Sequence, residues 1–413
     1  PYDIPVPGFE NDVVNTLRLW SAAARDEFDL EEFNAGSYAD SVASKNEAEN
    51  ITMVLYPNAA TENGQELRLR QQYFLASASL QDTIRNWQER HGDDFSTFAV
   101  KNCFQLNDTH PAVAVAELMR LLIDEHGMEW DDAWGITRST MAYTNHTLLP
   151  EALEMWPVAM FRRLLPRLLD IIYEIKARFI ADIGQHWPGD NDRIRRMSLI
   201  QEGAEPMIRM AYLAIVGSFS INGVAELHSR LLREGLFRDF AELWPARFNN
   251  KTNGVTQRRW LAACNPGLSS LISETIGDQW KTNLEELQAI SAHAGDESFQ
   301  ARWRQVKQAN KKRLAADIES KTGLSVSADM LFDVQVKRIH EYKRQLLNVL
   351  HAIHLYDRIR RGDGDALVPR LILIGGKAAP GYVMAKSVIK CINNVARVIN
   401  ADPAMQDKLQ MIF

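Results

Sequence analysis

The chain has 413 residues, of which 46% are hydrophobic and 24% charged, so it can form two or three domains with buried cores. Its formal net charge of −6 disfavours nonspecific nucleic-acid binding. No run approaches the roughly 18 apolar residues that span a bilayer, and PYDIPVPGFEND lacks the features of a signal peptide. Cys103, Cys264 and Cys391 have no CxxC spacing, which fits a reducing cytoplasm, and we expect all three thiols in or near a core.

The first hundred residues are mixed and rich in helix. Residues 11–28 have Val14, Leu17 and Trp20 at helical spacing, and ELRLRQQYFLASASLQDTIRNWQ predicts a long amphipathic helix. Between these two segments, ITMVLYPN indicates a strand and NAATENGQ a loop.

From residue 97 a theme of strand, polar loop and helix repeats. TFAVKNCFQL predicts a strand, NDTH a loop, and PAVAVAELMRLLIDEHG a helix with proline in its first turn. STMAYTNHT then leads into a long helical region interrupted at Pro157 and Pro166, and MIRMAYLAIVGSFS predicts an apolar helix. This alternation favours a doubly wound α/β architecture, in which the loops NDTH, TNHT and KTNG lie near the carboxyl ends of strands.

A second unit begins near residue 254, so we expect domains at 1–253 and 254–413. Residues 275–330 are helical and highly charged. A strand ending at Val336 is followed by a helix from about Tyr342, and the strand RLILIGG, the loop KAAPGY and another helix repeat the theme. KLQMIF indicates a strand that has just begun, so we expect the chain to be a segment of a longer protein.

One run, VKRIHEYKRQ, concentrates the basic residues Lys337, Arg338, His340, Lys343 and Arg344. We expect the first two at the strand's exit and Lys343 in the first turn or two of the following helix. Strand-exit amides and a helix N-terminus beside these cations make a phosphate site plausible. A solvated amphipathic helix is the alternative interpretation, and Arg344 is the member that we expect to be structural.

The other motifs are less specific. GGKAAPGY lacks the spacings of nucleotide loops, so close packing of helix and strand is a stronger interpretation than a phosphate cradle. KTNGVTQRRW, TNHT and NDTH suit hydroxyl recognition, but the same residues form turns and caps. His110 and His146 have no metal-ligand partners at suitable spacing, so we expect no metal site. Asp108, Glu151 and Glu226 could act as acid and base, but the sequence does not fix their separation.

Six ordered motifs carry a resemblance that spans essentially the whole chain. NDTHPA, TNHTLLPEALE, NGVAELHS, NNKTNGVTQRRW, FDVQVKRIHEYKRQLLN and GGKAAPGY are similar to the α-glucan phosphorylase family, which acts on glycogen, starch or maltodextrin. The resemblance implies two Rossmann-like domains of the glycosyltransferase B-type facing a cleft, both incomplete in this segment. It also implies pyridoxal 5′-phosphate and reversible phosphorolysis of terminal α-1,4-linked glucose to glucose 1-phosphate, with retention, in a cytoplasmic homodimer.

The resemblance also assigns roles in the second unit. Arg338 and Lys343 would hold the substrate phosphate, Lys337 the cofactor phosphate, and Tyr342 would contact glucosyl hydroxyls. Trp260 would lie near the cofactor ring. Two phosphate groups would then explain the clustered cations.

In the first unit, the resemblance places His146 and Asn253 on the glucosyl unit, with the His146 carbonyl stabilising the transition state. Asp108 and His110 would lie toward the acceptor side of the cleft.

Three features depart from the family pattern. The family's cofactor lysine lies in a glycine-rich motif beyond residue 413, so we expect the isolated chain to be inactive. In the gate loop VLYPNAATENG, Ala59 and Ala60 replace an acid and an amide, which puts control of access in doubt. Gln257 replaces a proline and is expected to loosen the turn before Trp260.

Two alternatives to the phosphorylase interpretation remain. A sugar-nucleotide glycosyltransferase of similar shape would need a nucleotide site in place of the phosphate cluster, and no pyridoxal phosphate. A non-catalytic glucan-binding protein would keep only the carbohydrate contacts.

Overall fold

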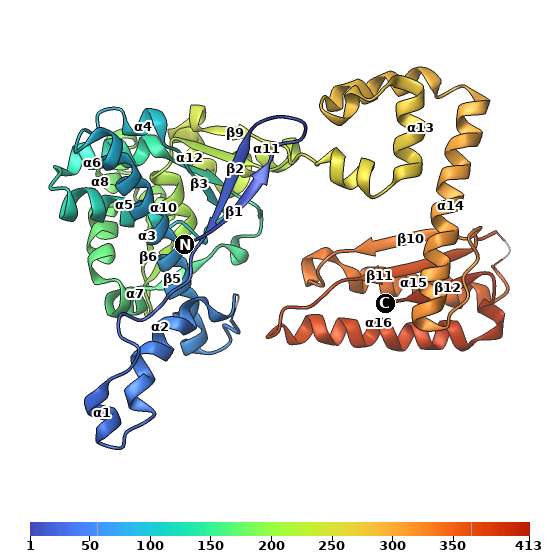
Figure 1. Ribbon diagram of the computed structural model, residues 1–413, viewed down its shortest axis with the longest axis horizontal. Coiled ribbons are helices and arrows are strands. Elements are labelled where there is room, and N and C mark those ends of the chain that lie inside the picture. The colour runs from blue at the N-terminus through green and yellow to red at the C-terminus, as the bar shows by residue number, and fades with distance from the viewer. Residues whose placement is uncertain (56, 365) are drawn as a thin grey trace. The chain divides into compact units, whose positions relative to one another are not determined.

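The computed structural model describes residues 1–55, 57–364 and 366–413. The chain divides into two compact units, Pro1–Gly254 and Val255–Phe413 (Figure 1). Each contains a parallel sheet with helices, so the predicted α/β class is confirmed. The break between the units lies one residue after the expected one.

The first unit is built on four parallel strands in the order β3-β4-β8-β9. Their bounds are β3 Phe104–Asn107, β4 Met141–Thr144, β8 Ser220–Gly223 and β9 Phe248–Asn250. Central residues such as Leu106, Tyr143 and Ile221 are at most 1% exposed, as expected for a sheet covered on both faces. A small antiparallel sheet is formed by β5 Met155–Pro157, β6 Ile200–Gln201 and β7 Met207–Arg209.

Helices connect these strands and enclose the core of the first unit (Figure 1). The helices α5 and α10 are almost entirely buried, with six of seven residues in each, so both lie inside the unit rather than on its surface. The helices are α1 Leu30–Asn34, α2 Ala43–Met53, α3 Glu62–His91, α4 Phe98–Lys101, α5 Ala114–Arg120, α6 Trp130–Thr140, α7 Val158–Leu164, α8 Pro166–His186, α9 Asn191–Met197, α10 Met210–Val216, α11 Glu226–Leu231 and α12 Arg238–Leu243.

Several local predictions in the first unit are wrong, at least in part. The apolar helix predicted over residues 207–220 is confirmed only for Met210–Val216, because Met207–Arg209 form β7 and Ser220 begins β8. Residues 11–28 contain no helix, because β2 Val14–Leu19 pairs antiparallel with β1 Tyr2–Pro7. Residues 51–53 end α2 rather than forming a strand, and Tyr56 of that predicted strand lies outside the described residues. The predicted strand 97–106 starts only at Phe104, because α4 occupies its first part.

The second unit has three parallel strands in the order β10-β11-β12, with bounds Leu331–Val336, Arg370–Gly375 and Leu409–Ile412. Its helices are α13 Pro266–Ile276, α14 Glu297–Thr322, α15 Gln345–Arg360 and α16 Val383–Ala401. Leu371 and Leu373 lie with α14, whereas Ile372 and Ile374 lie with α15 and α16. The sheet is therefore covered on both faces. The predicted strands and helices of residues 331–413 are confirmed, except that α15 begins at Gln345 rather than near Tyr342.

The thiols differ from expectation. Cys103 and Cys264 are exposed and Cys391 is half-buried, so only Cys391 lies against a core. Cys264 follows a π-helical segment, Arg258–Ala263, and its Sγ donates to the Trp260 carbonyl over 2.9 Å. Within the described ranges, no helix is long and apolar enough to cross a membrane.

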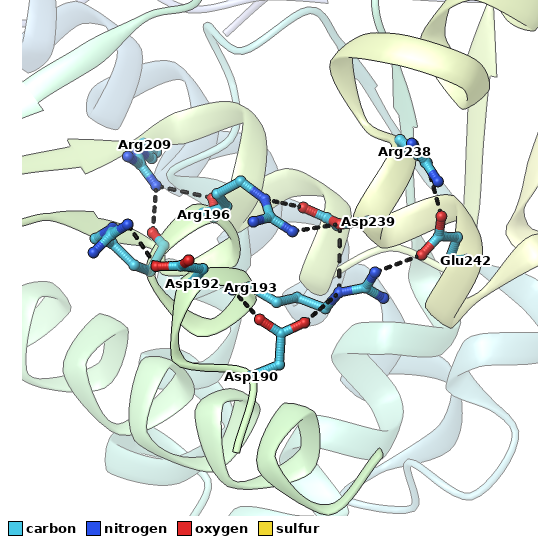
Figure 2. Close-up of polar contacts among 9 residues, drawn as sticks. Asp190, Asp192, Arg193, Arg196, Arg209, Arg238, Asp239 and Glu242 are labelled. Carbon is cyan, nitrogen blue, oxygen red and sulfur yellow. Dashed lines mark hydrogen bonds and ion pairs between the residues drawn. The ribbon is translucent and has the colours of Figure 1, made fainter. Parts of the chain in front are cut away.

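A network of ion pairs joins α9 to α12 (Figure 2). Two Arg196 nitrogens donate to the Asp239 carboxylate over 2.8 and 3.1 Å. Arg193 lies 3.5 Å from Asp239 and 2.8 Å from Glu242, and its guanidinium stacks on Trp187 at 4.1 Å. The hydrogen bond from Arg196 lowers the pKa of Asp239 despite its partial burial.

We expect Asp239→Asn to lower the free energy of unfolding at pH 7 by about 1–2 kcal/mol, since a hydrogen-bonded carboxylate between two arginines is lost. Because the folded-state pKa is lowered, this stabilisation is present above the unfolded-state pKa and disappears as the pH falls through the folded-state value. Urea denaturation at several pH values measures both effects. Asp192→Asn is the matched control, because its ion pair with Arg195 is more than 70% exposed on both sides and should contribute little. Equal losses for the two variants would contradict the prediction.

Candidate functional site

The parallel sheet of the first unit gathers polar residues at the carboxyl ends of its strands. Asp108 follows β3, Asn145 and His146 follow β4, and Asn253 lies three residues beyond β9. Main-chain bonds link these ends: the Asp108 amide donates to the Thr144 carbonyl over 3.0 Å, and the Asn253 amide to the Val224 carbonyl over 3.1 Å. The loops that the sequence predicted at strand ends therefore lie along one edge of the sheet.

A cavity of about 780 Å³ opens beside β3 in this unit and is lined by Asp108, His110 and His146. His146 is exposed, and its Nε2 lies 2.7 Å from Asn107 Oδ1. Asp108 has a positive φ of 64°, and its carboxylate accepts from the Thr109 amide over 2.7 Å, which compensates part of the strain. Asn253 is exposed and does not line this cavity. Three of the four candidate residues of the unit thus line one cavity, together with apolar side chains such as Leu75 and Phe104.

A carboxylate that the sequence analysis missed contacts three residues of the cavity lining. Glu154 Oε1 accepts from Arg68 over 2.9 Å and from Gln72 over 3.0 Å, and it lies 3.9 Å from His110 Nδ1. Burial opposes ionisation of Glu154, but His110, Gln72 and Arg68 outweigh it, so its pKa is lowered. Glu154 in turn raises the pKa of His110.

The His110–Glu154 contact predicts a pH dependence of stability. The folded-state pKa of His110 is raised. The contribution of protonated His110 to the free energy of unfolding is therefore fully present below the unfolded-state pKa, and it is lost as the pH rises through the folded-state pKa. We expect the difference in melting temperature between wild type and His110→Gln to shrink with rising pH. A difference that stays constant across the titration of histidine would contradict this.

His228 is a second residue that the sequence analysis did not single out. Its Nδ1 accepts from the Val224 amide over 3.1 Å, next to the end of β8. Burial lowers its pKa, and the nearby His146 adds to this effect, so a neutral ring is favoured. A Cβ at Gly223 would lie 2.6 Å from His228 Nδ1, so glycine at 223 permits the approach. The motif NGVAELHS contained this pair, but only the fold shows its contact.

The basic residues of the second unit lie in a loop between β10 and α15, which we call the basic loop, residues 337–344. Lys337 and Arg338 follow β10 directly and are exposed, as predicted. Lys343 is half-buried on a 3₁₀ turn, Glu341–Lys343, so its predicted place within the helix is wrong. Arg344 has a left-handed φ of 58°, which ends this turn before α15 begins.

The cations of the basic loop have no anionic neighbour in the described part of the chain. There, no carboxylate oxygen lies within 4.0 Å of the side-chain nitrogens of Lys337, Arg338 or Lys343. Lys343 Nζ instead lies 4.5 Å from the centre of the Tyr342 ring. Tyr342 is 58% exposed, so its hydroxyl is accessible to a ligand. This arrangement can receive an anion without first breaking an ion pair.

The loop GGKAAPGY holds the basic loop in place. The Lys337 amide donates to the Gly375 carbonyl over 2.9 Å, and the Ile339 amide to the Lys377 carbonyl over 3.0 Å. A Cβ at Gly376 would lie 1.9 Å from the Lys337 carbonyl oxygen, so only glycine allows this approach. The described contacts give the glycine-rich motif a packing role.

Aromatic contacts reinforce the same junction. Tyr382 Oη donates to a Glu341 carboxylate oxygen over 2.6 Å and accepts from the Glu341 amide over 3.2 Å. The His340 ring lies 4.6 Å from the Tyr342 ring and 4.9 Å from the Tyr382 ring. These contacts fix the two residues that precede Tyr342, and the His340 ring packs against the Tyr342 ring itself.

Trp260 lies at the start of the second unit and is 64% exposed, which suits a ligand contact better than a core position. Gln257 does not loosen the turn before it. Its buried Nε2 donates to the Lys281 carbonyl over 3.0 Å and to the Trp280 carbonyl over 3.4 Å. The expectation for Gln257 is therefore wrong, because the amide makes tertiary bonds that proline could not.

Comparison with known proteins agrees with these observations. The family model for carbohydrate phosphorylases matches residues 1–413. The chain is 52% identical to the brain form of glycogen phosphorylase from Bos taurus and to the muscle form from Homo sapiens, over 420 residues. These alignments cover 100% of this chain and 50% of each relative, so the chain spans about half their length. The chain belongs to the carbohydrate phosphorylase family.

Proposed function

We propose that the full-length protein containing this chain catalyses phosphorolysis of the terminal α-1,4-linked glucose of an α-glucan, giving α-glucose 1-phosphate with retention. The observation that supports it most directly is the basic loop between the exit of β10 and the start of α15. Among the residues that the structure describes, its three cations have no carboxylate partner. A guanidinium and two ammonium groups complement phosphate oxygens, and the helix end adds a favourable dipole. The similarity to glycogen phosphorylases supports the reaction type.

In this proposal, Arg338 and Lys343 bind the attacking inorganic phosphate and neutralise its charge. Tyr342 donates to glucosyl hydroxyls, and Asn253 and His146 hold the same sugar from the first unit. The His146 carbonyl would stabilise positive charge that develops at the anomeric carbon. Asp108 and His110, in the cavity beside β3, would contact the acceptor glucan. The glycosyltransferase B-type cleft between the two units is part of this proposal.

The residues present fit pyridoxal 5′-phosphate in two respects. Lys337 is an exposed cation beside the site proposed for substrate phosphate, and Trp260 presents an exposed aromatic face. When bound, the cofactor would supply a phosphate group that can share a proton with substrate phosphate. Lys337 would hold that group close to Arg338 by charge. We also propose that residues 1–413 alone are inactive, because the family's cofactor lysine has no counterpart among them.

The remaining parts of the proposal concern partners. We propose α-glucan and inorganic phosphate as substrates and a cytoplasmic homodimer as the working form, with neither nucleic acid nor membrane as a partner. The family similarity and the cysteine pattern support these assignments.

The test uses the full-length protein. Absorbance of bound cofactor is recorded, and release of glucose 1-phosphate from maltoheptaose is measured with and without inorganic phosphate. A phosphate-dependent product from a pyridoxal-containing protein is expected. Transfer from a nucleotide sugar without the cofactor would favour a glycosyltransferase, and glucan binding without either reaction would leave a carbohydrate-binding protein.

A further inference from the structure

The basic loop needs neutral support. Lys337, Arg338 and Lys343 repel one another, and in the described part of the chain no carboxylate within ion-pair distance offsets this repulsion. A flexible loop would therefore spread these cations apart. The carboxylate within the loop, Glu341, accepts from the Tyr382 hydroxyl and not from these cations. Neutral side chains can hold the main chain of the cations without binding them and competing with phosphate.

Gln345 provides such support at the centre of the loop. It is the first residue of α15 and is 1% exposed. Its Nε2 donates to the Arg338 carbonyl over 3.1 Å, and its Oε1 accepts from the His340 amide over 3.3 Å. One buried amide thus holds the main chain on both sides of Ile339, whose side chain is itself buried in the core.

Gln335 provides equivalent support at the end of the loop. From β10, its Nε2 donates to the Lys343 carbonyl over 3.1 Å. Its Oε1 accepts from Asn348 Nδ2 over 3.0 Å, which fixes the orientation of the amide. The carbonyls of the two residues proposed to bind substrate phosphate, Arg338 and Lys343, are therefore each held by a glutamine side chain.

The choice of glutamine has a chemical reason. Gln345 must donate to a carbonyl and accept from an amide, and only a side chain with both functions satisfies the two groups at once. An ionised glutamate would lose the donor, face the Arg338 carbonyl with a negative oxygen, and add an anion beneath the cations. An apolar residue would leave two part-buried main-chain groups without their partner.

We propose that Gln345 and Gln335 are positioning residues for phosphate binding, which act by fixing the main chain of Arg338 and Lys343. This inference rests on the proposed phosphorolytic function. It predicts that loss of either amide raises the KM for phosphate and leaves the KM for glucan unchanged. The glutamines touch neither substrate, and they hold only the main chain of residues proposed to bind phosphate.

The test is a double-mutant cycle in the full-length protein. Gln345→Met should raise the KM for inorganic phosphate about tenfold and leave the KM for maltoheptaose within about twofold. In an Arg338→Ala background, the same change should alter the phosphate KM by less than about twofold, since its effect passes through Arg338. Gln345→Glu and Gln335→Met are companion variants in case Gln345→Met folds poorly, and both should also raise the phosphate KM selectively.

Gln410→Met is the matched control. Gln410 lies on β12, and its Nε2 also donates to a carbonyl, that of Ser325, over 2.9 Å. Loss of this hydrogen bond should lower the melting temperature without changing the KM for phosphate. The inference is overturned if Gln345→Met acts with undiminished effect in the Arg338→Ala background, or raises both KM values equally. Absence of phosphorolysis in the wild type would instead refute the proposed function.

Discussion

Replacing Arg338 with alanine in the full-length protein is expected to lower kcat/KM for phosphorolysis by about 10²–10³-fold. The guanidinium is exposed and has no carboxylate within ion-pair distance in the described ranges, so its hydrogen-bonding capacity is available to the substrate. An arginine can bind two phosphate oxygens with parallel N–H bonds, and each charge-assisted bond exceeds a neutral one in strength. The loss should appear mainly as a higher KM for inorganic phosphate.

Two further variants separate specific binding from general charge. Arg338→Lys keeps the charge but not the planar fork, so we expect partial recovery only. Arg344→Gln removes the neighbouring positive charge, yet Arg344 ends the 3₁₀ turn in a left-handed conformation, and we assign it no ligand contact. Initial-rate kinetics with phosphate and maltoheptaose varied separately measure these effects. If Arg344→Gln is as damaging as Arg338→Ala, the basic loop acts only through its overall charge.

Gly376→Ala is expected to lower the free energy of unfolding by about 2–4 kcal/mol and to abolish most phosphorolytic activity. An added Cβ would lie 1.9 Å from the Lys337 carbonyl oxygen and 2.8 Å from its carbon, both of which belong to the main chain. Neither atom can move as the end of a flexible side chain can, so the loop GGKAAPGY and the basic loop must separate. The bonds at Lys337 and Ile339 would lengthen together.

The neighbouring glycine is the control for this substitution. A Cβ at Gly375 would meet only the Val336 methyl groups, at 3.7 and 3.9 Å, which is ordinary contact. We expect Gly375→Ala to keep both stability and the phosphate KM near wild-type values. Urea denaturation and the kinetic assay test the pair. Equal behaviour of the two alanine variants would show that the close approach at Gly376 does not control the basic loop.

Much of the candidate site follows from local sequence. The alternation of Phe332, Val334 and Val336 followed by helical spacing placed Lys337 and Arg338 correctly at the exit of β10. The same reasoning placed the loops NDTH and TNHT at strand ends, since buried strands of parallel sheets end where apolar runs give way to polar residues. Family membership was also readable, because six motifs occur in a fixed order.

Local patterns misled where a segment is short or its partner is distant. Val14, Leu17 and Trp20 fit a helical period, but β2 is defined by pairing with β1. The expectation for Gln257 was wrong because its side-chain amide forms tertiary hydrogen bonds that the sequence does not reveal. The expectation for Lys343 was wrong because Arg344, in a left-handed conformation, separates its 3₁₀ turn from α15.

The order and spacing of the residues were enough to predict the fold class and the family, and to propose which side chains would contact phosphate and sugar. The polar groups that contact those side chains, or their main chain, could be identified only in the folded chain. Glu154 beside His110, His228 beside Val224, and Gln345 beside Arg338 lie 4 to 44 positions apart in the chain or across a sharp turn. Hydrogen bonds of this kind leave no periodic pattern, because they depend on distances that arise only when strands and loops have packed.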